Sequence, residues 1–163
     1  MSESVQLITS SLLEQTVERA RSSPRLRTNH NFHPSDDAKL HRFLNALVRG
    51  TYVTPHRHIA PPKPESFLVL SGQIAFFIFD ETGSVSHCYR LGEGGVIGID
   101  VAAGMWHSMA VLSENAVIYE VKPGPYSPIS DKEFAPFAPR EGDAKAVDYL
   151  SRLLQHVERA PTA

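Results

Sequence analysis

The first 50 residues carry apolar side chains at helical spacing in two separate segments. In residues 10–23, Leu13, Val17 and Ala20 recur every three or four positions, as on one face of an amphipathic helix. Residues 34–50 repeat this spacing. Their apolar positions are Leu40, Phe43, Leu44 and Leu47. The pattern therefore predicts two helices, joined by an irregular segment rich in arginine and histidine.

From Thr51 to about Lys122 the pattern changes to short runs of β-branched and aromatic residues, separated by Gly, Asp, Asn and Ser. The runs are residues 65–72, 73–79, 84–91, 95–101, 107–112 and 116–122. Many short strands with turns between them are typical of a β-sandwich or barrel. We therefore expect a mainly β core in this part of the chain.

Helical spacing returns near the C-terminus, in residues 143–160. The apolar positions there are Val147, Leu150, Leu154 and Val157. The sequence thus predicts one globular domain in three parts. They are an N-terminal helical arm (1–49), a barrel (50–123), and a C-terminal loop and helix (124–163).

Composition narrows the class of protein. The chain has 163 residues, which suits one domain, and its net charge of −2 shows no overall basic excess that would indicate binding to nucleic acid. It contains no apolar run of the roughly 20 residues that a membrane helix needs. The N-terminus does not resemble a signal peptide, and a single cysteine, Cys88, suits a reducing compartment. We expect a cytoplasmic protein that binds neither nucleic acid nor membranes.

Three histidines and a glutamate form the strongest candidate for chemistry. His56 and His58 point to the same side of an extended chain, because side chains on a strand alternate between faces. Glu65 begins the next run, and His107 follows a glycine turn at the start of a later one. Imidazoles with a carboxylate are typical ligands of one divalent transition metal, such as Fe, Mn, Zn or Ni. The alternative is a set of buried, hydrogen-bonded histidines, with Glu65 as a charge at the rim.

The spacing of these residues resembles the first motif of the cupin superfamily. Five residues separate Gly50 from His56, and six separate Glu65 from Gly72, as in that motif. Six residues also lie between His58 and Glu65, where cupins commonly have three or four.

The stretch "AAGMWH" resembles the second cupin motif at Gly104 and His107, with Ala102 where proline is usual. The whole chain resembles the WbuC family of cupin-fold metalloproteins, through "SSPRLRTNHNFHPSDD", "PHRHIAPPKPE" and "EFAPFAPREGD". This resemblance implies a cupin-type double-stranded β-helix (jelly-roll) barrel and a bound metal. It also implies a link to surface-polysaccharide gene clusters, without an established reaction.

Several functions are compatible with this reading. The leading one is a metalloenzyme that acts on a sugar or nucleotide-sugar derivative, for example by isomerisation or epimerisation. The alternatives are a non-catalytic, metal-stabilised ligand-binding or sensor protein, and an iron-dependent dioxygenase. Candidate catalytic groups are Tyr119, Lys63 and His33. We expect Tyr119 to point inward, because it alternates with Val117 and Val121 along its strand.

Two further expectations concern partners. Arg25 and Arg27 lie in the segment between the predicted helices, and a planar guanidinium suits a carboxylate or phosphate. This favours an anionic small-molecule ligand, with that segment lying across the barrel mouth. A solvated helix end is the simpler explanation of these charges. Leu68 and Leu70 lie on the strand face opposite Glu65, and a terminal helix or a second subunit could cover them, so we expect a homodimer.

Overall fold

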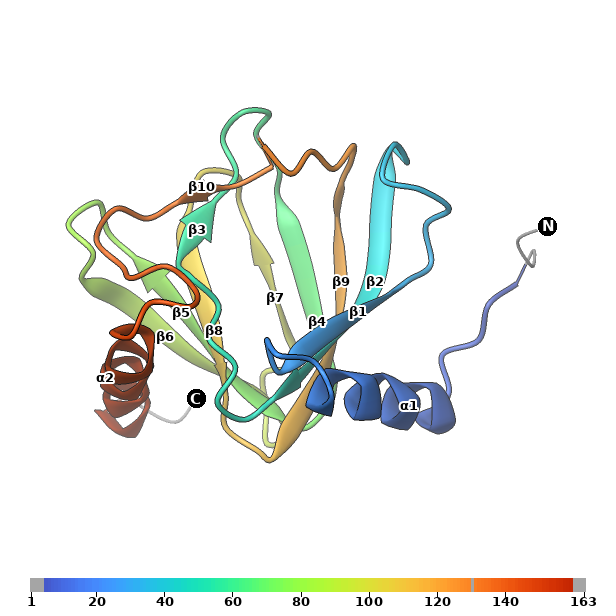
Figure 1. Ribbon diagram of the computed structural model, residues 1–163, viewed down its shortest axis with the longest axis horizontal. Coiled ribbons are helices and arrows are strands. Elements are labelled where there is room, and N and C mark those ends of the chain that lie inside the picture. Colours follow the sequence, from blue (N-terminus) through green and yellow to red (C-terminus); the bar gives the residue numbers. More distant parts are fainter. Residues whose placement is uncertain (1–4, 130, 160–163) are drawn as a thin grey trace.

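Two five-stranded antiparallel sheets face each other in the computed structural model, which describes residues 5–129 and 131–159 (Figure 1). The first sheet has the order β1 (Arg27–Asn31), β2 (Leu40–Val48), β9 (Asn115–Pro123), β4 (Glu65–Ser71) and β7 (Gly98–Val101). The second has the order β10 (Glu133–Phe134), β3 (His56–Arg57), β8 (Trp106–Val111), β5 (Gln73–Phe79) and β6 (Val85–Gly92). The mainly β fold expected from the sequence is confirmed, and its two facing antiparallel sheets are consistent with a jelly roll.

Helix α1 (Ser10–Arg21) covers the outer face of the first sheet, as Figure 1 shows in blue. The Thr9 hydroxyl caps the helix by accepting a hydrogen bond from the Leu12 N–H at 3.2 Å. Val17 and Ala20 are buried against the outward side chains of β2 and β9. The first predicted helix and its apolar face are therefore confirmed.

Helix α2 (Ala146–Arg159) covers the outer face of the second sheet. Leu153 and Val157 pack there among aromatic side chains that include Phe77 and Trp106. Val147, which the sequence pattern placed on the apolar face, is 72% exposed, and Leu153 is buried instead. Neither α1 nor α2, within the described part of the chain, is long and apolar enough to cross a membrane.

The predicted helix over residues 34–50 is wrong, because this segment contains β2. Strand β2 pairs with β1 on one side and β9 on the other. Its inward side chains, such as Phe43, and its outward ones, such as Leu44 beneath α1, are both buried. A strand buried on both faces carries apolar residues at positions that also fit a helix. The barrel therefore includes two strands from the expected arm (1–49), and Gly50 is not its boundary.

The interior of the sandwich is apolar at one end and hollow at the other. The apolar core includes Ile74, Phe76 and Ile118, and extends to Phe67 and Met109. These last two also line a cavity of about 660 Å³. The chain that follows β9 crosses the top of the sandwich to reach β10 (Figure 1). The fold thus leaves a polar hollow between the sheets at one end.

Candidate metal centre

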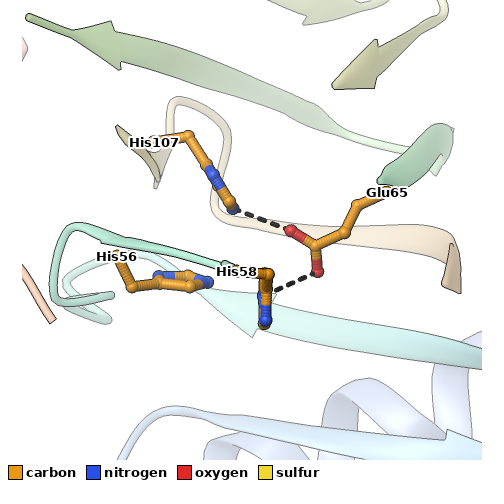
Figure 2. Close-up of side chains that lie close together, drawn as sticks. All are labelled: His56, His58, Glu65 and His107. Atoms are coloured by element: carbon orange, nitrogen blue, oxygen red, sulfur yellow. Dashed lines mark ion pairs between the residues drawn. The ribbon is translucent and has the colours of Figure 1, made fainter. Parts of the chain in front are cut away.

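Four buried side chains from both sheets converge beside the cavity. His56 lies on β3, His58 directly follows it, and His107 lies on β8, where it pairs in register with His56. Glu65 opens β4 in the opposite sheet. Their candidate ligand atoms all lie within 4.8 Å of one another. Figure 2 shows His58 and His107 next to the Glu65 carboxylate, with the ring of His56 beside His58.

The outer nitrogen of each imidazole is held by a backbone carbonyl. Nδ1 of His56 bonds to Thr54 O at 3.0 Å, and Nδ1 of His107 bonds to Met105 O at 2.9 Å. Nδ1 of His58 bonds to Asp131 O. A carbonyl oxygen can only accept, so each Nδ1 donates its proton and each Nε2 retains a lone pair. This is the tautomer in which an imidazole binds a metal through Nε2.

The Nε2 atoms of two imidazoles face the Glu65 carboxylate oxygens with no hydrogen between them. Nε2 of His58 lies 3.3 Å from Oε1 of Glu65, and Nε2 of His107 lies 3.0 Å from Oε2 (Figure 2). Both nitrogens and Oε2 are buried and have no hydrogen-bond partner among the described residues. Lone pairs held this close repel each other, and buried polar atoms are normally satisfied. A divalent cation between them would resolve both problems, so the residues present fit a metal.

Electrostatics keep these groups in their ligating forms. Burial, together with the charge on Lys132 and the neighbouring His107, lowers the pKa of His56 well below its usual value. His56 is therefore neutral at neutral pH. Burial alone would raise the pKa of Glu65, but the hydrogen bonds that His107 and His58 donate when their Nε2 atoms carry a proton, together with the charge on Lys122, lower it well below its usual range. Glu65 is thus a carboxylate.

The family model described as "Domain of unknown function (DUF6016)" matches residues 8–91, just over half of the chain. The chain belongs to the DUF6016 family. The matched region contains α1, the strands from β1 to β5, and three of the four converging side chains. No curated protein matches the sequence.

Solved structures share the fold of this DUF6016 chain. CapF from Staphylococcus aureus, a capsular polysaccharide assembling protein, aligns with a TM-score of 0.57 and 20% identity. That alignment covers 69% of this chain and 32% of CapF. The protein TT1209 from Thermus thermophilus aligns with a TM-score of 0.53 and 18% identity, over 73% of this chain and 97% of TT1209. The cupin domain of Schizosaccharomyces pombe Cnp3 gives 0.47 and 13%, over 60% of each chain. The DUF6016 chain thus spans about a third of CapF, and at these identities the likeness to CapF and TT1209 extends to the fold alone.

The long connection between His58 and Glu65 turns a lysine into the protein interior. Nζ of Lys63 donates to Oδ1 of Asp131 at 2.6 Å, and both side chains are 2% exposed. Lys63 also donates to the carbonyl of Pro125. These bonds anchor the connection while Glu65 still reaches His58 and His107. Lys63, a candidate catalytic group, therefore lies in a buried ion pair and is absent from the described cavity lining.

The other two catalytic candidates occupy different environments in the DUF6016 fold. Tyr119 does not point inward as expected, since it lies on the outer face of the first sheet, 6.0 Å from the ring of Phe32 and close to α1. His33 is buried and lines the cavity. It stacks on His41 with ring centroids 4.0 Å apart.

The alternation that turns Tyr119 outward turns two charged neighbours into the cavity. Glu120 and Lys122 are both buried, and Nζ of Lys122 lies 3.3 Å from Oε1 of Glu120 and 3.3 Å from Oε1 of Glu65. Burial raises the pKa of Glu120 more than the neighbouring Lys122 lowers it. Sequence reasoning missed this pair. The available signal was two charges at alternate positions within an otherwise apolar strand.

Arg25 and Arg27 lie at the rim of the cavity, where Glu141 binds both. Nε of Arg25 is 2.8 Å from Oε1 of Glu141, and an Arg27 guanidinium nitrogen is 2.6 Å from Oε2. The segment expected to cross the barrel mouth contains strand β1, which is paired along its length with β2. It forms a side wall of the cavity, with Asn29 and Asn31 along it.

Proposed function

We propose that this DUF6016 chain is a divalent-metal-binding cupin that acts as an enzyme on a sugar or nucleotide-sugar derivative. The metal assignment rests on Nε2 of His58, Nε2 of His107 and Oε2 of Glu65, which are buried, have no hydrogen-bond partner in the part of the chain that the structure describes, and converge with His56. These four residues would hold the ion. When bound, it supplies Lewis-acid polarisation of a substrate oxygen.

The cavity suits a small molecule with many hydroxyl groups. Its volume of about 660 Å³ falls within the range of ligand-binding pockets. Asn29, Asn31 and Asn45 line it with amide groups, and the Oδ1 atom of Asn45 is buried without a partner among the described residues. A ligand hydroxyl would satisfy that oxygen. The resemblance to the WbuC family, and the fold shared with the capsular polysaccharide assembling protein CapF, add support for a polysaccharide setting.

Glu120 is the residue we assign to proton transfer. It lines the cavity, and its raised pKa brings it closer to the range in which a carboxyl group exchanges protons at neutral pH. Lys122 bridges Glu120 and Glu65, so it would hold both carboxylates in place. Isomerisation or epimerisation of a sugar needs one group that removes and returns a proton, and Glu120 would perform that role.

Metal analysis tests the first half of the proposal. Protein purified without chelator should contain close to one transition-metal ion per chain by elemental analysis, and His107→Ala should lose most of it. His87→Ala, at an exposed histidine on β6, is the matched control and should retain it. Full occupancy in the His56→Ala/His107→Ala double variant would refute the metal site.

Solvent exchange tests the enzymatic half. Metal-loaded protein would be incubated in D₂O with a panel of nucleotide sugars, and deuterium incorporation followed by NMR. The proposal predicts incorporation into at least one sugar by wild type and a loss of about 100-fold or more in Glu120→Gln, as for removal of a general base. Tight binding of a sugar without exchange or turnover would refute the enzymatic assignment and favour a binding protein.

A further inference from the structure

A second, smaller cavity of about 230 Å³ adjoins the main one. The two share part of their lining, including Val53, His56, Lys132 and Phe134. The smaller cavity, which we call the side cavity, therefore opens next to the candidate metal ligand His56. A ligand that fills the main cavity can extend into it.

The side cavity is strongly basic. It is lined by four basic side chains, Arg25, Arg27, Lys132 and Arg140, and by one carboxylate, Glu141. The main cavity shares Arg25, Arg27 and Lys132 with it, but it also contains the carboxylates of Glu65 and Glu120, which lie against Lys122. The positive charge of the side cavity is thus not balanced by the residues that line it.

The single carboxylate is already used by two of the four cations. Glu141 binds Arg25 and Arg27 through both of its oxygens. Within the described residues, Lys132 and Arg140 form no ion pair or hydrogen bond through their charged ends. The Arg140 guanidinium lies over the Phe134 ring, 4.3 Å from its centre, in a cation–π contact that does not use its N–H donors in a hydrogen bond to a carboxylate. Two cations therefore remain available to a ligand.

Lys132 is the inner of these two cations. It lies close enough to His56 to contribute to the lowered pKa of that imidazole. Burial, and then repulsion from Lys122, lowers the pKa of Lys132 more than the carboxylates of Glu120, Glu65 and Asp131 raise it. A partly desolvated ammonium beside another cation is stabilised by an anion more than a solvated one would be.

We propose that the side cavity binds an anionic group of the ligand, a phosphate or a carboxylate, with Lys132 and Arg140 as its direct partners. The remainder of the ligand would lie in the main cavity, so the assignment of that remainder as a sugar rests on the proposed function above. Lysine supplies a point charge and arginine a planar fork, the two groups most used for such anions. Arg25 and Arg27 instead hold Glu141 and the wall of the side cavity in place.

The test is calorimetric titration with three probes of similar size: glucose 1-phosphate, glucuronate and glucose. At least one anionic probe should bind wild type, with glucose weaker by about tenfold or more, the usual effect of a charge-assisted hydrogen bond. Lys132→Gln and Arg140→Gln should each weaken the anionic probe by a similar factor. Lys145→Gln, at an exposed lysine before α2, is the matched control and should bind like wild type. The preferred probe, phosphate or carboxylate, identifies the anion.

Arg140 is exposed, so Arg140→Gln gives a readout even if Lys132→Gln folds poorly, and Lys132→Arg should restore part of the binding. Equal affinity for glucose and the anions, or anion binding unchanged in both glutamine variants, would overturn the proposal. Metal content and binding to chelator-stripped protein are measured in parallel. If chelator-stripped protein still binds the anion, and this binding depends on Lys132, the anion site is supported even if the metal assignment fails. Anion binding that requires metal but not Lys132 would refute the side cavity alone.

Discussion

The cluster of His56, His58, Glu65 and His107 and the cluster of Arg25, Arg27 and Glu141 both gather polar groups from distant parts of the sequence. In the histidine cluster, backbone carbonyls accept hydrogen bonds from the outer nitrogens. The buried inner atoms have no partners among the described residues. In the arginine cluster, Arg25 and Arg27 bind both carboxylate oxygens of Glu141. Convergence alone therefore does not identify a ligand site. A ligand site is identified by buried polar atoms that have no hydrogen-bond partner in the folded chain.

The largest difference should come from removing one member of each cluster. His107→Ala should lower metal affinity by more than about 100-fold, because even residues that only support a ligand change it by ten- to 100-fold. Arg27→Ala should leave metal content unchanged. Elemental analysis and melting temperature, each with and without added metal, check both variants. Added metal should raise the melting temperature of wild type and Arg27→Ala but not of His107→Ala. A rise in the melting temperature of His107→Ala on addition of metal would contradict the assignment of His107 as a metal ligand.

Next in size is the contrast between a buried and a half-exposed ion pair. Asp131→Asn should lower the free energy of unfolding by about 3–5 kcal/mol, because it leaves the buried Lys63 ammonium without its counter-charge. Glu141→Gln should cost no more than about 1 kcal/mol, as is usual for ion pairs in contact with solvent. Urea unfolding of the metal-free proteins measures both.

A double variant separates this charge effect from simple loss of packing. Lys63→Met with Asp131→Asn should recover part of the stability, since no unpaired charge remains. The metal content of Asp131→Asn should stay close to that of wild type, because the carbonyl that holds His58 is retained. Equal losses of unfolding free energy in Asp131→Asn and Glu141→Gln would contradict the claim that, of these two, only the Lys63–Asp131 pair is a costly buried ion pair.

A smaller effect is the pH dependence of the arginine cluster. Burial would raise the pKa of Glu141, but hydrogen bonds from Arg25 and Arg27 lower it below its ordinary value of 4.5. A carboxyl group with a lowered pKa in the folded state stabilises the protein fully above its unfolded pKa. That contribution is lost as the pH falls through the folded pKa. The stability difference between wild type and Glu141→Gln should be constant near neutral pH and shrink below about pH 4.5.

Urea unfolding of the metal-free proteins at several pH values measures this difference. Glu14→Gln, at an exposed glutamate on α1, is the control and should show no such trend. A difference that grows as the pH falls would contradict the sign of the shift.

The smallest expected effect is that of Tyr119→Phe, because its side chain lies outside the cavity. Metal content and sugar exchange should both match wild type. Glu120→Gln, one position along the same strand, should lower exchange by about 100-fold or more while retaining the metal. Loss of exchange in Tyr119→Phe would mean that the outer face of the sheet takes part in the reaction.

The sequence predicted the mainly β fold and the convergence of the four candidate ligands, through local spacing and the motif resemblance that this spacing carries. The interval between His56 and His58 sets their common direction on a strand, and glycines at fixed distances mark the turns around them. The structure brings both histidines to Glu65 despite the longer connection, because Lys63 anchors that connection from within. Such an anchor depends on Asp131, which lies 68 residues away and which local spacing cannot predict.

The errors arose where a face normally exposed to solvent is covered. Helix α1 buries the outer face of β2, so Leu44 and Phe43 are buried on opposite sides and resemble helical spacing. Helix α1 also covers the apolar face of β9, so that face is the outer one. Tyr119 therefore points outward, opposite to the prediction, and Glu120 lines the cavity, which the sequence pattern did not indicate. Alternation gives two faces, but only tertiary packing decides which of them lines the cavity.

Anomalous X-ray scattering from crystals of protein purified without chelator tests the metal site most directly. Data collected on both sides of the absorption edge of the metal found by elemental analysis would locate the ion. The account predicts one peak per chain, about 2.0–2.2 Å from Nε2 of His56, His58 and His107 and from a carboxylate oxygen of Glu65. A peak bound by other side chains, or no peak together with hydrogen bonds from Nε2 to Glu65 in metal-supplied crystals, would contradict it.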